Sequence, residues 1–287
     1  AVGFGVLVRQ ELVGSIKGGW ISKTALTLAE IPLNIKTMFD GGDLAVEDRF
    51  STLDGFDGTP NIEESYLLLS RYDGDLQEGV VELVDLRNFE VLHTWNPDID
   101  AFNEIVEKLE LDEFKNIKRD GNNSRSIIRH PILTKDGHLF WVYGGPLRGI
   151  DACSNLSFHN TFDQFHHSIE IDVDENIWVP SHMYPYTLET YKVGDHFLED
   201  GIIKLSLSGE VLFKKSIAQI FIENGLEYLL FSVGVSQAAG SGNFDTDPIH
   251  LNDIQPVNFD GEFWKKGDVF VSLRHQSMVF LYRPSTN

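Results

Sequence analysis

Residues 201–214, GIIKLSLSGEVLFK, decide the fold, because they carry two short strand-like runs on either side of a polar turn. The same hairpin pattern occurs as VVELVDLRNFEVLHTW at 80–95 and as GIDACSNLSFH at 149–159. A second recurring piece, a polar turn followed by an apolar strand, is found at three places: KDGHLFWV at 135–142, DENIWV at 174–179 and KGDVFVSL at 266–273. Hairpin pairs that recur at about 40 residues are typical of β-propeller blades. The sequence therefore predicts an all-β fold of repeated antiparallel blades.

The spacing of three histidines fits this repeat. His167 follows His130 by about one 40-residue blade. The interval from His167 to His250 is about twice as long, which we interpret as one blade that carries an insertion. Apolar residues recur at helical spacing within 216–230, so the insertion is predicted to be a helix. Residues 99–118 are predicted to form another inserted helix. We expect three nearly complete blades and one partial blade.

The N-terminal residues differ from the rest of the chain. Residues 1–8, AVGFGVLV, are apolar, and two interpretations are open: a buried or frayed first strand, or the remnant of a signal anchor. Residues 21–39 are predicted to be a helix capped by Ser22. The chain is thus divided into an apolar and helical segment, 1–40, and a partial propeller domain, 41–287. No run of about 18 apolar residues exists, so nothing is expected to span a membrane unaided.

Charge and cysteine content narrow the function classes. The chain has 23 Lys+Arg against 44 Asp+Glu, which gives a formal net charge of −21. Nucleic acid is therefore not expected as a partner, and charge alone will not attach the chain to anionic lipid. Cys153 is the only cysteine, so an intrachain disulfide and a thiolate metal cage are excluded.

Three polar segments lie where predicted blades begin or end: FHHSIEIDVDENIWV at 165–179, DPIHLNDIQPV at 247–257 and VSLRHQS at 271–277. In a propeller the equivalent strand of each blade lines the central channel. His167, His250 and Arg274 are therefore expected to meet although they are far apart in sequence. Taken singly, each has a structural interpretation as well, a histidine that bonds a neighbouring blade or an arginine in an ion pair.

Two metal-site interpretations are not favoured. Asp172, Asp174 and Asn176 imitate the opening of a calcium loop, but Met183 stands where a bidentate Glu is required. These residues are better explained as a hairpin turn. An all-histidine site could be drawn from His166, His167, His182 and His196. The helical His-x-x-x-His spacing that would support it is missing, so no metal is predicted.

The ordered set of a His pair, then His-x-Asn, then Ser-x-Arg-His-Gln resembles the arylsulfotransferase family of bacterial six-bladed propellers. LLLSRYDGDLQEGVVELVDL, upstream of that set, adds to the resemblance, which covers roughly residues 60–287. The resemblance implies a six-bladed β-propeller of which this chain covers only part. We expect a fragment that lacks the C-terminal blades.

The resemblance also implies a chemistry. A small aromatic sulfate donor gives its sulfuryl group to a histidine, and a phenolic acceptor takes it from the sulfohistidine, with no nucleotide or other cofactor. By position, His167 matches the channel histidine, His250 and Asn252 match the His-x-Asn motif, and Arg274 matches the Ser-x-Arg motif. A sulfuryl group in transfer spreads negative charge over its oxygens, which a guanidinium meets with several donors.

One family element has no counterpart. The family's nucleophilic histidine follows the Ser-x-Arg segment in a further motif, so we expect it beyond Asn287, and His275 is not assigned to that role. The expected location is the periplasm or another extracytoplasmic space, with an N-terminal membrane tether. Alternatives are a non-catalytic acidic propeller that serves as a binding or scaffold subunit, and a hydrolase that uses water as acceptor. The oligomeric state is left open.

Overall fold

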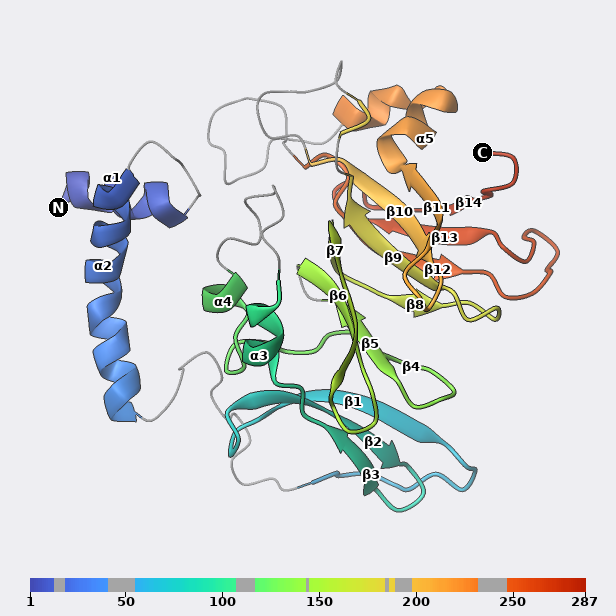
Figure 1. Ribbon diagram of the computed structural model, residues 1–287. Helices are drawn as coiled ribbons and strands as arrows, with labels where there is room; N and C mark the ends of the chain where they lie inside the picture. The colour runs from blue at the N-terminus through green and yellow to red at the C-terminus, as the bar shows by residue number, and fades with distance from the viewer. Residues whose placement is uncertain are drawn as a thin grey trace.

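Short apolar strands pair into antiparallel sheets along most of the chain after residue 65 (Figure 1). The computed structural model describes residues 1–12, 19–40, 55–106, 117–142, 145–183, 186–188, 198–231 and 247–287. Within these residues the strands are antiparallel and the helices few, so the predicted all-β class is confirmed.

The strands follow one another as four meanders in three sheets. The first sheet contains β1 (Tyr66–Asp73), β2 (Glu78–Asp85) and β3 (Glu90–Trp95). The eight-stranded sheet contains β4 (Ile132–Leu133), β5 (Leu139–Val142), β6 (Gly145–Ile150), β7 (Leu156–Phe165), β8 (Glu170–Ile171), β9 (Ile177–His182), β10 (Asp200–Leu205) and β11 (Val211–Ser216). The third sheet contains β12 (Leu251–Pro256), β13 (Val269–Leu273) and β14 (Met278–Tyr282).

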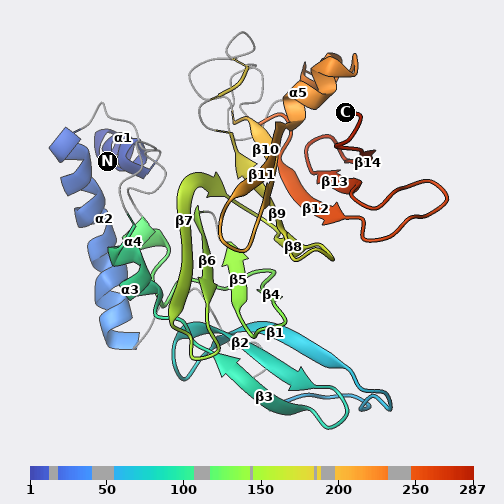
Figure 2. The same ribbon diagram turned by 45° about the vertical axis from the view of Figure 1, so that its right-hand side comes forward.

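The eight-stranded sheet consists of two four-stranded meanders, β4 to β7 and β8 to β11. Within the described residues they are joined where β7 meets β9, through the pairs Gln164↔His182 and Phe165↔Ser181. The third sheet lies against β8 and β9, as both ribbon views show (Figure 2). The described strands form open sheets, and the six-bladed ring stays a prediction.

The three predicted hairpins are confirmed as β2–β3, β6–β7 and β10–β11. In the last of them the turn closes with Gly209 at φ 89°, a left-handed conformation that glycine adopts without a Cβ clash. Ile202, Ile203 and Leu205 on β10 are fully buried. Since β10 lies between β9 and β11, its apolar side chains pack on both faces of the sheet.

The helices are α1 (Val2–Leu12), α2 (Gly19–Asp40), α3 (Ile99–Glu104), α4 (Ile117–Asp120), α5 (Ile217–Glu223) and the 3-10 helix η4 (Glu227–Phe231). Residues 2–8 lie within α1, so the first-strand interpretation is wrong. Ser22 is buried inside α2 and is not its cap. Among the helices the structure describes, none is long and apolar enough to cross a membrane.

Both predicted insertions contain helix. Within 216–230, Ser216 caps α5, because its Oγ accepts a hydrogen bond from the Gln219 backbone N–H at 3.2 Å. Within 99–118, α3 and α4 are helical, and residues 107–116 lie outside the described residues.

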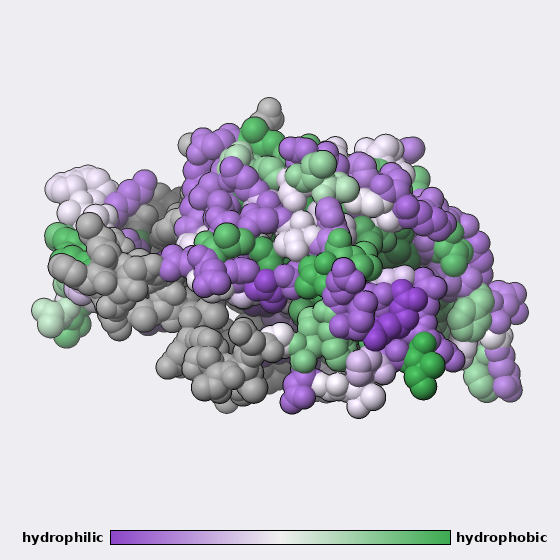
Figure 3. Space-filling view, turned by 90° about the horizontal axis from the view of Figure 1, so that it is seen from below, coloured by the Kyte–Doolittle hydropathy of each residue, from purple (hydrophilic) through white to green (hydrophobic). Residues whose placement is uncertain are grey.

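The apolar core forms three clusters along the sheets. The first cluster packs α5 against β12 and β13. The second contains side chains of the successive strands from β5 to β10. The third packs β2 and α3 against β5. The face seen in Figure 3 is a mosaic of hydrophilic and hydrophobic residues. Single exposed apolar residues such as Phe263 are ordinary on a protein surface.

Asp172 organises the turn between β8 and β9, as the hairpin interpretation predicts. Its Oδ1 accepts the backbone N–H groups of Asp174 and Asn176 at 3.0 and 2.9 Å. Its Oδ2 accepts the Trp178 indole N–H at 3.0 Å and lies 2.8 Å from Lys204 Nζ. Burial alone raises the pKa of Asp172, but these donors outweigh burial and hold the pKa below its ordinary value.

Asp172→Ala is therefore expected to destabilise the fold by about 3 kcal/mol, because the buried indole N–H of Trp178 loses its acceptor. Chemical denaturation at neutral pH measures the loss. The stability that the Asp172 carboxylate adds is present above its ordinary pKa of 3.8 and declines as pH falls below it. Asp174→Ala is the matched control, since Asp174 is exposed and its pairing with Lys266 is worth less than about 1 kcal/mol. Equal stability of the two variants would contradict this role.

Candidate functional site

Three histidines occupy the same place in successive meanders. His130, His167 and His250 come just before β4, β8 and β12, the first strands of their meanders. All three have positive φ angles, of 44°, 62° and 51°. Left-handed backbone costs a non-glycine residue roughly 1–3 kcal/mol, so its recurrence marks a shared turn that aims each side chain. The spacing in the sequence thus corresponds to equivalent structural positions.

The structure brings His167 and His250 together in a larger group, which we call the histidine array: in spatial order His182, His166, His167, His250 and His275. Successive ring centroids lie 4.4, 5.0, 5.0 and 4.6 Å apart along that order. The rings come from the ends of β7 and β9, the start of β12 and the turn after β13. The predicted meeting of the first two motifs is present in the structure.

Asp247 fixes one end of the array. Its Oδ2 lies 2.5 Å from His250 Nδ1, and its backbone carbonyl lies 2.5 Å from His275 Nδ1. A carboxylate and a carbonyl oxygen accept hydrogen bonds, so both rings donate from Nδ1. Each of these two histidines then presents the lone pair of Nε2, the tautomer that acts as a base or nucleophile.

The other end of the array surrounds Asp200. His166 Nε2 lies 3.0 Å and His182 Nε2 lies 3.5 Å from Asp200 Oδ1. His182 Nδ1 is 2.7 Å from Gln164 Oε1, and His166 Nδ1 is 2.9 Å from His167 Nδ1. Asp200, His182 and Gln164 do not stand out in the sequence. They come together because β9 pairs with both β7 and β10.

Burial keeps the middle of the array uncharged. The pKa of His167 falls to about 4 because of burial first and then the neighbouring rings of His166 and His250. The pKa of His182 also falls to about 4, through burial and then His166. Burial raises the pKa of Asp200, but its contacts with His166, His182 and the Leu251 backbone N–H together outweigh burial and lower the pKa. At neutral pH the Asp200 carboxylate thus lies next to an uncharged His182.

Arg274 lies beside His250 but outside the strand. Its backbone N–H donates to the His250 carbonyl at 3.0 Å. β13 ends at Leu273, and Arg274 begins the turn to β14. The side chain is exposed, and no described residue pairs with its guanidinium. Among the residues that the structure describes, the guanidinium therefore has no competing carboxylate.

Asn252 sits at a bulge in β12. The pairing with β13 shifts register between Leu251 and Asp253, so Asn252 has no partner in the ladder. Its Oδ1 is buried and makes no hydrogen bond within the described residues. A bulge of this kind changes the direction of a side chain, and here that side chain is the asparagine of the His-x-Asn motif.

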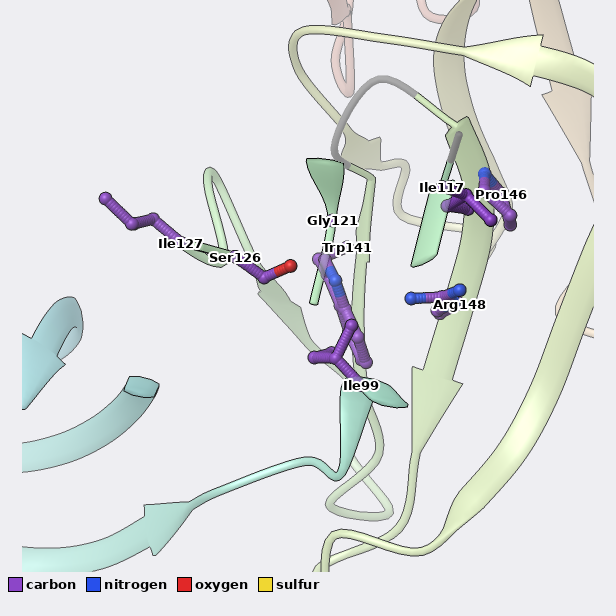
Figure 4. A pocket seen from close by; sticks show the side chains of 8 residues that line it. All are labelled: Ile99, Ile117, Gly121, Ser126, Ile127, Trp141, Pro146 and Arg148. Carbon is purple, nitrogen blue, oxygen red and sulfur yellow. The ribbon is translucent and has the colours of Figure 1, made fainter. Parts of the chain in front are cut away.

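A separate small cavity lies near α3 and α4 (Figure 4). It is lined by Ile99, Ile117, Gly121, Ser126, Ile127, Trp141, Pro146 and Arg148. Arg148 is buried, donates to Asn103 Oδ1 at 2.5 Å, and has its pKa lowered to about 10 by burial. None of the four predicted site residues lines this cavity.

A family model described as Arylsulfotransferase (ASST) matches residues 130–287, which is more than half of the chain. The chain belongs to the arylsulfotransferase family. The matched region contains the histidine array, Asn252 and Arg274, and it begins at the first of the three histidines with positive φ. The resemblance drawn from the motifs is confirmed.

No curated protein sequence matches this arylsulfotransferase-family chain. Among solved structures, it is similar to a protein of unknown function from Bacteroides caccae, with 10% sequence identity and a TM-score of 0.35. The match covers 70% of this chain and 54% of that one, so the chain spans about half the length of that protein.

Proposed function

We propose that this chain provides the sulfuryl-binding part of a nucleotide-independent arylsulfotransferase site. In the reaction, the bond between sulfur and the donor's phenolic oxygen breaks while a bond to a histidine nitrogen forms, and a phenolate leaves. The acceptor phenol then loses its proton and takes the sulfuryl group as the sulfur–nitrogen bond breaks. The observation that carries the proposal is the bond from the Arg274 backbone N–H to the His250 carbonyl, which places Arg274 next to a residue whose imidazole contacts that of His167.

The roles follow from charge and tautomer. Arg274 holds the sulfuryl oxygens, because its planar fork offers several donors to a tetrahedral anion. Asn252 adds its amide from the bulge. His250, whose Nδ1–H is held by Asp247, has Nε2 free to remove the acceptor's proton. His167 stays neutral, so its imidazole is an uncharged polar group that does not compete with Arg274 for the anion.

The sulfohistidine is proposed to lie outside this chain, as the family resemblance implies. His275 is not assigned to it, because its place in the turn belongs to the Ser-x-Arg segment. The four-stranded meanders β4–β7 and β8–β11 are proposed to be blades of a six-bladed ring. An extracytoplasmic location and an N-terminal membrane tether are proposed with it.

The test is binding and turnover of 4-nitrophenyl sulfate by the 287-residue chain. We expect calorimetry to show binding of the ester, weakened at least tenfold in His250→Ala, with no release of nitrophenolate on addition of phenol. His138→Ala is the control, since His138 lies in an exposed turn next to β5. A wild-type chain that binds no ester would favour the acidic scaffold instead. Turnover that His250→Ala abolishes would assign the sulfohistidine to His250.

A further inference from the structure

Three side chains at one end of the histidine array form a group of metal-ligating atoms. His166, His182 and Asp200 follow β7, end β9 and begin β10. Their ligand atoms all lie within 4.8 Å of one another. We call these three residues the His-His-Asp cluster. His166 and Asp200 are each less than one-tenth exposed, so water does not satisfy their facing atoms.

The hydrogen bonds around the cluster point the lone pairs inward. His182 donates from Nδ1 to Gln164 Oε1 at 2.7 Å, so its Nε2 carries the lone pair toward Asp200. His166 has its Nδ1 2.9 Å from the Nδ1 of His167, and two nitrogens at that distance share a single proton. With that proton on His166, its Nε2 also presents a lone pair to Asp200.

A hydrogen bond also fixes the position of the Asp200 carboxylate. Its Oδ2 accepts the backbone N–H of Leu251 at 2.8 Å, which ties β10 to β12 and fixes the carboxylate plane. Its Oδ1 is buried, and the 3.0 Å approach of His166 Nε2 lacks hydrogen-bond geometry. A carboxylate oxygen that faces two imidazole lone pairs without a cation is an unfavourable arrangement.

We propose that the His-His-Asp cluster binds a divalent transition-metal ion, with Zn²⁺ as the best fit. Zinc bonds to nitrogen and oxygen of about 2.0–2.2 Å in a tetrahedron place neighbouring ligand atoms roughly 3.3 Å apart. The distances of 3.0 and 3.5 Å from Asp200 Oδ1 to the two Nε2 atoms bracket that separation. Two imidazoles and one carboxylate leave the fourth position for water.

The hydrogen-bond partners of the two histidines support this assignment. A metal-bound histidine ordinarily donates its other ring N–H to an acceptor, which sets the tautomer and the ring orientation. Gln164 does this for His182, and His167 does it for His166. The array therefore couples the metal to His167 through one shared proton. The metal site does not depend on sulfuryl transfer being the reaction.

A second triplet, Asp247, His250 and His275, serves as an internal comparison. There both Nδ1 atoms already donate to oxygens of Asp247. Asp247 thus already has hydrogen-bond partners, in contrast to the buried Oδ1 of Asp200. We therefore confine the proposal to the first cluster.

Zn²⁺ titration of the chelator-treated 287-residue chain tests the proposal. We expect calorimetry to show one Zn²⁺ per chain with a Kd in the micromolar range or tighter, and a higher melting temperature on addition of Zn²⁺. His182→Ala should weaken binding at least 100-fold. His250→Ala, in the second triplet, and His138→Ala, in an exposed turn, should bind Zn²⁺ as the wild type does.

Gln164→Leu extends the test to the residue that accepts the Nδ1–H of His182. It should weaken Zn²⁺ binding roughly 10–100-fold while the fold is kept, and change the visible absorption of the Co²⁺-loaded chain. This variant also keeps the proposal testable if His182→Ala fails to fold. A wild-type chain that binds no Zn²⁺, or a His182→Ala chain that binds it as tightly as the wild type, overturns the proposal. Either result would leave a proton shared between His166 and Asp200 as the occupant, and neither bears on ester binding by Arg274.

Discussion

Asp200→Ala is expected to lower the melting temperature of the chain by roughly 10 °C, corresponding to about 3–5 kcal/mol. The carboxylate is almost completely buried, and its Oδ2 accepts the backbone N–H of Leu251. Removing the carboxylate leaves that buried N–H without an acceptor. Because the Leu251 bond crosses from β10 to β12, its loss also loosens the contact between two sheets.

Calorimetric melting in the presence of a chelator measures this effect without any contribution from bound metal. Asp200→Asn is the matched variant, since an amide oxygen still accepts from Leu251 while the charge is lost. We expect its melting temperature to lie between those of the wild type and Asp200→Ala. If Asp200→Ala has the same melting temperature as the wild type, Asp200 is not a structural link between the sheets.

The hairpins were predictable because their signals are local. In 201–214, apolar residues flank a polar turn with glycine at the position of positive φ, and short-range sterics fix both features. The recurrence of that pattern then predicted the meanders. Closure of the meanders into a ring depends on contacts between sheets, which a local pattern does not contain.

The site was predictable only where it follows the repeat. His167 and His250 could be found because equivalent repeat positions lie at the same end of the first strands. His182 and Asp200 could not, because they are placed by the pairing of β9 with both β10 and β7. In the sequence, His182 could be grouped with three other histidines, His166, His167 and His196. Nothing in the sequence pointed to Asp200, the carboxylate that lies beside His182 and His166.

Arg274 shows how a strand boundary limits such predictions. Val269–Leu273 alternates as a strand should, and the pattern can be continued through Arg274. The pairing of Leu273 with Met278 instead closes a turn, with Ser277 at φ 46°. The four polar residues of that turn are therefore presented together, so Arg274 is exposed rather than buried in a sheet.

Arg274→Lys is expected to weaken sulfate binding about tenfold, and Arg274→Met by about 100-fold. A hydrogen bond to a charged group contributes roughly 1.5–3 kcal/mol, and lysine keeps the charge but loses the planar fork. The formal net charge of −21 opposes binding of any anion to this protein, so measurable affinity must come from a local site. Calorimetric titration with sulfate at low ionic strength gives both values.

Arg87→Lys is the matched control, because both arms of its guanidinium already pair with Asp85 and it lies in the first sheet. It should bind sulfate as the wild type does. Asn252→Ala should give a smaller loss than Arg274→Met, since an amide adds one neutral hydrogen bond where the guanidinium adds charge. Equal affinities for the wild type and Arg274→Met would mean that the exposed guanidinium beside His250 holds no sulfuryl oxygen. The family chemistry would then have to act through the imidazoles alone.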